Sequence, residues 1–386
     1  MANRPNPLHP HAAYSEHSPA HAKVWRSMLI LPHHWHPIHG TSFRNPAVND
    51  RPALRSEFFL NPKYWPMWIA LGTMWCVAHM PYRLQSFIGR TIGRALRLSL
   101  KDRRAIARIN LGLCFPELSD SQRKTLLKRH FESLGMGMVE TAMCWWTPAK
   151  RLHPLVQVDG LENLQQALAR GKGVILLSAH FTTTEIGARL LHLFVPFHAS
   201  YRKHNNPLFE TVMRRAREAH CQTAIPRGDI RAFLRSLKQN VPIWYAPDQN
   251  YSPRHNIVFA PFFGVPAATV TATARLAQMS GAPVVPFFPQ RCDDGSGYRL
   301  CILPALEDFP SGDIAADTAR INRIIEDAVR QVPAQYLWVH RRFKTRPEGE
   351  VYLYPPGGKK KHHRTQAGDT PPPGPGPGGT SEARQQ

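Results

Sequence analysis

Acidic residues are scarce in this chain: 27 Asp and Glu stand against 49 Lys and Arg in 386 residues, leaving a net charge of +22 at pH 7. A field of that strength attracts anionic partners such as nucleic acid, an acidic membrane, a phosphorylated substrate or an acidic carrier protein. The sequence also lacks zinc-finger spacing, an aromatic RNA-binding signature and a sustained basic helix with heptads. We therefore expect no nucleic-acid partner.

Cysteines and cofactor motifs are also sparse. The six cysteines are scattered without a Cys-x-x-Cys pair, a pattern typical of packing residues in a reduced, cytosol-facing protein rather than of a metal site. Ser178 is not surrounded by a Gly-x-Ser-x-Gly elbow, so nothing calls for a covalent enzyme intermediate. We predict a reaction that uses neither a metal nor an organic cofactor.

Neither end of the chain has the composition of a folded domain. Residues 1–60 hold no apolar core with a small-residue cleavage site, so they do not form a secretory signal. They are rich in His and Pro and are predicted to be a disordered leader or an over-extended gene start. Residues 356–386, with Lys359–Lys361 and a Pro/Gly-rich run, are predicted to be a disordered tail.

Long apolar runs are rare, and the most notable extends from Tyr64 to Tyr82. It carries no formally charged residue, is fringed by Trp and Tyr, and is just long enough to cross a bilayer core of about 30 Å. Several Arg and Lys follow it, which by the positive-inside rule places that side in the cytoplasm. We predict a membrane-anchor helix over 61–82, with a buried or interfacial helix as the alternative; both place the protein on the inner membrane.

The remaining chain, 83–355, is predicted to form one domain. Residues 83–150 have helical patterns, and Ser119 and Gln122 form a capping box before an amphipathic helix. From about residue 170 strands and helices alternate, which predicts an α/β fold with a mixed sheet flanked by helices. The predicted strands are 174–179, 196–201, 222–225, 242–246, 283–288 and 298–303. The predicted helices are 184–193, 208–219, 229–238, 268–279 and 315–331.

A histidine stands where the first strand of this alternation gives way to a helix. His180 follows the apolar run that begins at Val174, and Glu185 comes five residues later. A carboxylate touching one imidazole nitrogen would prepare the other nitrogen to accept a proton from a hydroxyl. Five residues subtend about 500° on a helix, so the two side chains can meet only if His180 sits in the turn before it. The alternative is a capping histidine with Glu185 as an ordinary first-turn acid.

Five further residues are candidates for substrate binding. Arg202 ends a predicted strand and could grip a phosphate or an oxyanion, or form a structural ion pair. Asn206 could cap the helix near Pro207, and Asp248 follows the strand 242–246, where it could bind substrate or cap a loop. Arg341 and Arg342 belong to a basic block that could meet phosphates or could be a solvated face.

Six sequence blocks in order resemble the lipid A late acyltransferases, the lauroyl and myristoyl transferases of lipopolysaccharide assembly. The resemblance runs from about Asn61 to Glu350 and includes the His-x4-Glu motif shared with glycerolipid-type acyltransferases. The blocks are His180–Arg189, Tyr201–Pro207, Trp244–Gln249, Pro261–Gly264, Ser280–Pro286 and Tyr336–Pro347. The terminal segments fall outside it, which puts the true start codon in doubt.

The resemblance implies a fold like that of the glycerolipid acyltransferases and a specific reaction. A fatty acyl group would pass from acyl carrier protein to a hydroxyl of an acyl chain on a Kdo-bearing lipid A precursor, at the cytoplasmic face of the bacterial inner membrane. His180 would be the general base and Glu185 its orienting partner. The alternatives are an acyltransferase for another glycerophosphate or glycolipid acceptor, and a non-catalytic basic protein that binds membrane lipids.

Overall fold

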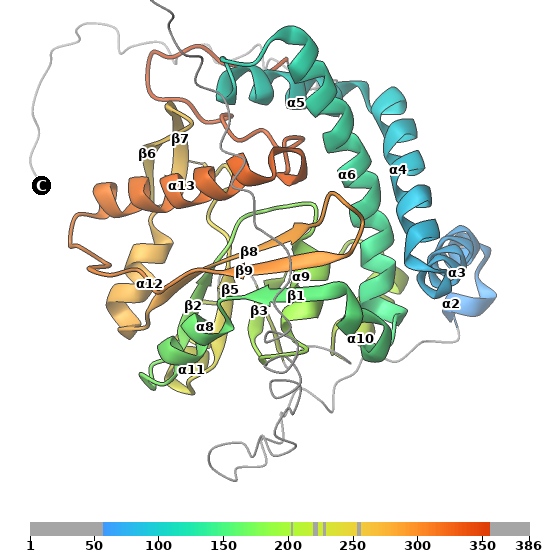
Figure 1. Cartoon of the computed structure of the whole chain (residues 1–386), viewed down its shortest axis with the longest axis horizontal. Coiled ribbons are helices and arrows are strands. Elements are labelled where there is room, and N and C mark those ends of the chain that lie inside the picture. Colours follow the sequence, from blue (N-terminus) through green and yellow to red (C-terminus); the bar gives the residue numbers. More distant parts are fainter. Residues whose placement is uncertain (1–56, 202–203, 219–222, 227–228, 253–255, 356–386) are drawn as a thin grey trace, which may run out of the picture. The chain divides into compact units, whose positions relative to one another are not determined.

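The computed structural model describes residues 57–355, apart from 202–203, 219–222, 227–228 and 253–255 (Figure 1). The tail predicted over 356–386 and all but the last four residues of the predicted leader lie outside the described residues. Those four, Glu57–Leu60, form the short helix α2. Arg202 also lies outside the described residues.

A seven-stranded mixed sheet forms the centre of the fold. Every neighbouring pair is parallel except β8 and β9, which are antiparallel, so β9 and β1 run against the other five strands. The predicted α/β class and mixed sheet are confirmed. The strands, in spatial order, are β1 (Val156–Asp159), β9 (Tyr298–Ile302), β8 (Val284–Arg291), β2 (Val174–Leu177), β5 (Pro242–Tyr245), β3 (His198–Tyr201) and β4 (Thr223–Pro226).

Helices cover both faces of the sheet because β2 alternates its side chains between two hydrophobic cores. Ile175 and Leu177 pack in the core that contains residues of α11, α12 and α13, whereas Val174 and Leu176 pack in the core that contains residues of α8, α9 and α10. The helices are α8 (Leu161–Leu168), α9 (Thr184–Leu191), α10 (Pro207–Glu218), α11 (Ile230–Lys238), α12 (Ala272–Ser280) and α13 (Ile314–Gln331).

The predicted helix over 268–279 is wrong in its first residues. Val265–Val270 form strand β7, which pairs antiparallel with β6 (Ile257–Phe262) in a separate hairpin. The two-residue turn between them, Phe263 and Gly264, has positive φ at both positions (52° and 73°), the backbone that a tight hairpin requires. The β-branched ends of Val265–Val270 favour a strand, and the helix α12 begins only at Ala272.

The N-terminal part is helical, as predicted, and α6 is its longest element. Its capping box is present: the Ser119 hydroxyl accepts from the Gln122 amide, and the Gln122 side chain accepts from the Ser119 amide. Helix α4 lies alongside α6 (Figure 1), with Gly93 against the backbone of Phe131 and Glu132. The bounds are α3 (Trp65–His79), α4 (Tyr82–Ser99), α5 (Lys101–Cys114) and α6 (Asp120–Trp146).

The apolar stretch after residue 60 folds into a shorter helix than predicted. Helix α3 has 15 residues and ends before Met80 and Pro81, so it is about 22 Å long. Among the described helices, none combines the length and the apolar character needed to cross a membrane. The spanning helix predicted over 61–82 is therefore not found there.

A buried histidine on α6 makes the stability of the fold depend on pH. His130 has no exposed surface, and its Nδ1 lies 3.1 Å from the Ala334 carbonyl oxygen. Burial disfavours the charged imidazolium and lowers the pKa of His130 from 6.5 to about 4, although the bond to Ala334 partly opposes this. Between those two pH values the unfolded chain binds more protons than the folded one, so stability falls as the pH is lowered.

We expect His130→Gln to reduce this pH dependence, because glutamine can donate to the Ala334 carbonyl but does not titrate. From pH 7 to pH 5 the wild-type free energy of unfolding should fall by about 2 kcal/mol more than that of the variant. Urea unfolding at the two pH values measures the difference. Equal losses in the two proteins would contradict the prediction.

Candidate active site

His180 lies just beyond the carboxyl end of β2, in the loop that leads into α9. The strand ends at Leu177 and the helix begins at Thr184, which confirms the predicted change from strand to helix. The His180 ring lies edge-on to Trp244, with centroids 6.1 Å apart, and its side chain is 29% exposed. The imidazole therefore packs against the protein and keeps part of its surface accessible.

Asp248 is the carboxylate that contacts His180. Its Oδ1 lies 2.6 Å from His180 Nδ1, and its Oδ2 accepts a 2.9 Å hydrogen bond from the His180 amide. The contact follows from the sheet register: Leu177 at the end of β2 pairs with Tyr245 at the end of β5, so residues three positions beyond each strand end meet. An ionised carboxylate only accepts, so His180 Nδ1 carries the proton and Nε2 keeps its lone pair.

The Asp248 carboxylate is strongly held in its charged form. Its side chain is 2% exposed, and burial alone would raise its pKa. The charge of His180, the two hydrogen bonds from His180 and the nearby charge of Arg342 outweigh burial and lower the pKa of Asp248 to about 2. At neutral pH Asp248 is therefore an ionised carboxylate.

Residues 336–340 pack against both His180 and Asp248. The Leu337 amide donates to the His180 carbonyl at 3.0 Å, and the buried Tyr336 hydroxyl lies beside Asp248, where burial and that negative charge raise the pKa of Tyr336. His340 Nε2 accepts from the Asn250 amide at 2.9 Å. Burial lowers the pKa of His340 to about 4 although Asp248 opposes the shift, so this imidazole is neutral at pH 7.

The predicted contact between Glu185 and His180 is not present in the structure. Its carboxylate forms two bonds with the Arg217 guanidinium of α10, at 2.9 and 2.7 Å, and both side chains are about one-third exposed. The first turn of α9 directs Glu185 toward α10, whereas His180 lies in the preceding loop beside the end of β5. A role for Glu185 in the reaction stays a prediction of the resemblance.

The other predicted substrate residues lie in different settings. Asn206 caps α10, since its Oδ1 accepts from the Phe209 amide at 3.1 Å. Arg342 is 2% exposed and donates to the Ala268 carbonyl and the Thr269 hydroxyl of β7 at 2.8 and 2.6 Å. Arg342 is therefore neither a solvated charge nor open to a ligand. Its hydrogen bonds connect the C-terminal segment to the β6–β7 hairpin. Arg341 is half-buried.

Tyr336 and His340 are not among the predicted site residues, although both stand in the Tyr336–Pro347 block. That block is dense in aromatic and basic residues, a pattern that could have indicated the site but that also predicts a basic surface. Within the described ranges, no group of three or more His, Cys, Asp and Glu side chains is arranged to hold a metal ion.

Comparison with known proteins identifies relatives that share most of this chain. Residues 54–345 match the family described as bacterial lipid A biosynthesis acyltransferase. The chain is 43% identical over 300 residues to the lipid A biosynthesis palmitoleoyltransferase of Escherichia coli K12, which covers 78% of this chain and 97% of the relative. It is 39% identical over 300 residues to the lauroyltransferase of that strain, covering 78% and 98%. It is 32% identical over 301 residues to the myristoyltransferase, covering 77% and 92%.

Proposed function

This chain belongs to the bacterial lipid A biosynthesis acyltransferase family and is an acyltransferase of lipid A biosynthesis. We propose that His180 is its general base and that Asp248 orients His180. The observation that carries the proposal is the 2.6 Å contact between His180 Nδ1 and the buried Asp248 carboxylate. It leaves Nε2 unprotonated, on a side chain that is 29% exposed.

The geometry supports a single-displacement acyl transfer. Nε2 of His180 takes the proton of the acceptor hydroxyl while that oxygen attacks the carbonyl carbon of a thioester. The carbon–oxygen bond forms, the carbon–sulfur bond breaks, and the proton passes from His180 to the departing thiolate. Asp248 stabilises the imidazolium that exists between these two proton transfers, because its negative charge stays next to Nδ1.

We propose acyl carrier protein thioesters as donors and a Kdo-bearing lipid A precursor as acceptor. The support is chemical: the net charge of +22 suits an acidic carrier and a phosphorylated lipid. The names of the relatives include palmitoleoyl, lauroyl and myristoyl transferases, so the length of the donor chain varies among them.

A transfer assay read by mass spectrometry tests this function. Purified protein would receive a Kdo-bearing tetra-acyl lipid A precursor with a panel of acyl carrier protein thioesters. We expect a mass gain of one acyl group with at least one donor, and the preferred donor gives the chain length. Folded protein that transfers nothing to this precursor, but acylates a glycerophosphate or another glycolipid, would replace the proposed acceptor.

We further propose that α3 and α4 hold the protein on the cytoplasmic face of the inner membrane. Helix α4 exposes Phe87 and Leu98, both 65% exposed, on a face that also carries the exposed Arg83, Arg90 and Arg94. Apolar side chains between arginines are typical of helices that lie in a membrane interface. Trp68 and Trp75 of α3 line a largely apolar hollow of about 460 Å³ with Trp145 and Trp146 of α6.

The double substitution Phe87→Glu and Leu98→Glu is expected to weaken binding to vesicles that contain an anionic phospholipid by about tenfold or more. Each change replaces an apolar contact worth about 1.5–3 kcal/mol with a charge repelled by the lipid. Co-sedimentation with vesicles measures the affinity. The matched control is Ile230→Glu with Met279→Glu, two exposed apolar residues of α11 and α12. An equal loss in the control would show that α4 is not the contacting face.

A further inference from the structure

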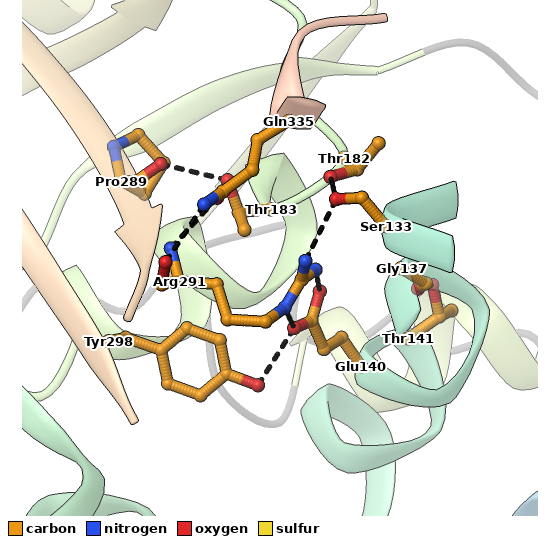
Figure 2. Close-up of polar contacts among 10 residues, drawn as sticks. All are labelled: Ser133, Gly137, Glu140, Thr141, Thr182, Thr183, Pro289, Arg291, Tyr298 and Gln335. Carbon is orange, nitrogen blue, oxygen red and sulfur yellow. Dashed lines mark hydrogen bonds and ion pairs between the residues drawn. The ribbon is translucent and has the colours of Figure 1, made fainter. Parts of the chain in front are cut away.

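A buried ion pair lies beneath the loop that carries His180. Arg291, at the end of β8, donates from Nε and one terminal nitrogen to the two carboxylate oxygens of Glu140 on α6, at 2.6 and 2.7 Å (Figure 2). The Tyr298 hydroxyl adds a 2.8 Å bond to the same carboxylate. Glu140 is 0% exposed and Arg291 10%, so the pair is not accessible as a ligand site.

Two routes lead from this pair to the loop. In the first, the remaining terminal nitrogen of Arg291 donates to Ser133 Oγ at 2.8 Å, and Ser133 Oγ lies 2.6 Å from Thr182 Oγ1. In the second, the Gln335 side chain accepts from the Arg291 backbone N–H and donates to the Arg291 backbone carbonyl, each at 2.8 Å. The backbone carbonyl of Gln335 then accepts from the Thr182 backbone N–H at 2.7 Å. Both routes end on Thr182, two residues after His180.

The loop is also held on its other sides. Thr183 Oγ1 donates to the Pro289 carbonyl of β8 at 2.8 Å (Figure 2). Gly137 of α6 faces the Thr182 carbonyl so closely that a Cβ there would lie 2.7 Å from its oxygen. The segment 181–183 is therefore enclosed by α6, β8 and Gln335, with directional bonds at successive residues.

Stability alone does not explain the pair. The cost of removing two charges from water offsets much of their attraction, and apolar side chains of similar size are often as stabilising. A buried ion pair instead restricts its neighbours to one arrangement, because each oxygen and N–H is directed to a partner. Here the partners lead to the loop that carries the proposed base.

We propose that Glu140 and Arg291 are positioning residues, which hold Thr182 and through it the backbone that places His180 against Asp248. The inference rests on the proposed function of His180. It predicts that cutting the connection leaves the protein folded and able to bind its donor, but lets His180 leave the geometry needed for proton transfer. A misplacement of about 1 Å can cost on the order of a hundredfold in rate.

The test uses Glu140→Gln, which removes the charge, and Thr182→Val, which cuts the connection at the loop and leaves the ion pair intact. Hydrogen–deuterium exchange of the full-length protein would be followed over residues 178–186 and over the β6–β7 hairpin as an internal reference. We expect at least tenfold faster exchange in 178–186 in both variants and no change in the hairpin. The matched control is Glu132→Gln. Glu132 lies on α6, like Glu140, and forms a more exposed ion pair with Arg94 of α4, so its substitution should change neither segment. Unchanged exchange in 178–186 would overturn the inference.

The kinetic readout separates positioning from a purely structural role. Each variant is expected to lower kcat about tenfold with the KM for the acyl donor unchanged, the loss of about one directed hydrogen bond. Because both changes cut one connection, the double variant should lose no more than the worse single variant. If instead the kcat of the double variant falls about a hundredfold, the two single losses are independent, and the connection through Ser133 is overturned. If the wild-type protein transfers no acyl group, the proposed function fails, and the exchange result alone decides whether the loop is positioned in this way.

Discussion

His180→Ala is expected to lower kcat for acyl transfer by about a thousandfold or more while the melting temperature changes by only a few degrees. General base catalysis by a positioned side chain contributes on the order of 10²–10⁴ in rate, and the substitution removes Nε2, the nitrogen that keeps its lone pair while Nδ1 faces Asp248. The variant also leaves the buried Asp248 carboxylate without its Nδ1 partner. Mass spectrometry of the transfer product measures the rate, and circular dichroism confirms folding.

His198→Gln is the matched control for that change. His198 is also a largely buried imidazole of the central sheet, but it stands at the beginning of β3, and its Nδ1 lies 2.8 Å from Ser236 Oγ. Its replacement should leave kcat within about threefold of wild type. Wild-type transfer by His180→Ala would remove His180 from the mechanism. If the wild-type protein and His180→Ala both bind vesicles but neither transfers an acyl group, the alternative of a non-catalytic basic membrane-binding protein would be favoured.

Most of the fold could be predicted from the sequence because its strands are apolar and its helices periodic. The predicted strand 174–179 contains the fully buried β2, and the capping box at Ser119 places the start of α6 correctly. Strand β1, Val156–Asp159, was missed because half of its four residues are polar. The β6–β7 hairpin was missed because its turn uses Phe263 with positive φ instead of the expected Asn or Asp.

The site was less predictable than the fold, because its main contact joins residues 68 positions apart. Periodicity identifies the strands before His180 and Asp248, but it does not show that β2 and β5 are neighbours in the sheet. The sequence offered Glu185 as the nearby carboxylate, although the angle of roughly 140° between positions five apart on a helix already separated the two side chains. Arg342 was assigned to a surface because the carbonyl and hydroxyl that it binds belong to the unpredicted hairpin.

Asp248→Asn is expected to lower kcat by about 10²–10⁴ and to leave the KM for the acyl donor nearly unchanged. Each oxygen of Asp248 accepts one bond from His180, from the amide at 2.9 Å and from Nδ1 at 2.6 Å. Asparagine has only one oxygen for these two donors. If its NH₂ group faces Nδ1, the imidazole must carry its proton on Nε2, which can no longer accept the proton of a hydroxyl.

If the asparagine oxygen faces Nδ1 instead, the NH₂ group meets the His180 N–H, and two donors oppose each other. The loop must then shift, and the imidazolium also loses the carboxylate that stabilised it. Both orientations therefore reduce kcat more than binding. Asp317→Asn is the matched control, since Asp317 is equally buried at 2% and accepts from the Ser311 amide at 3.1 Å with both oxygens. That variant should lose stability with kcat unchanged within about threefold. Equal effects of the two substitutions on kcat would mean that Asp248 supports the fold rather than the base.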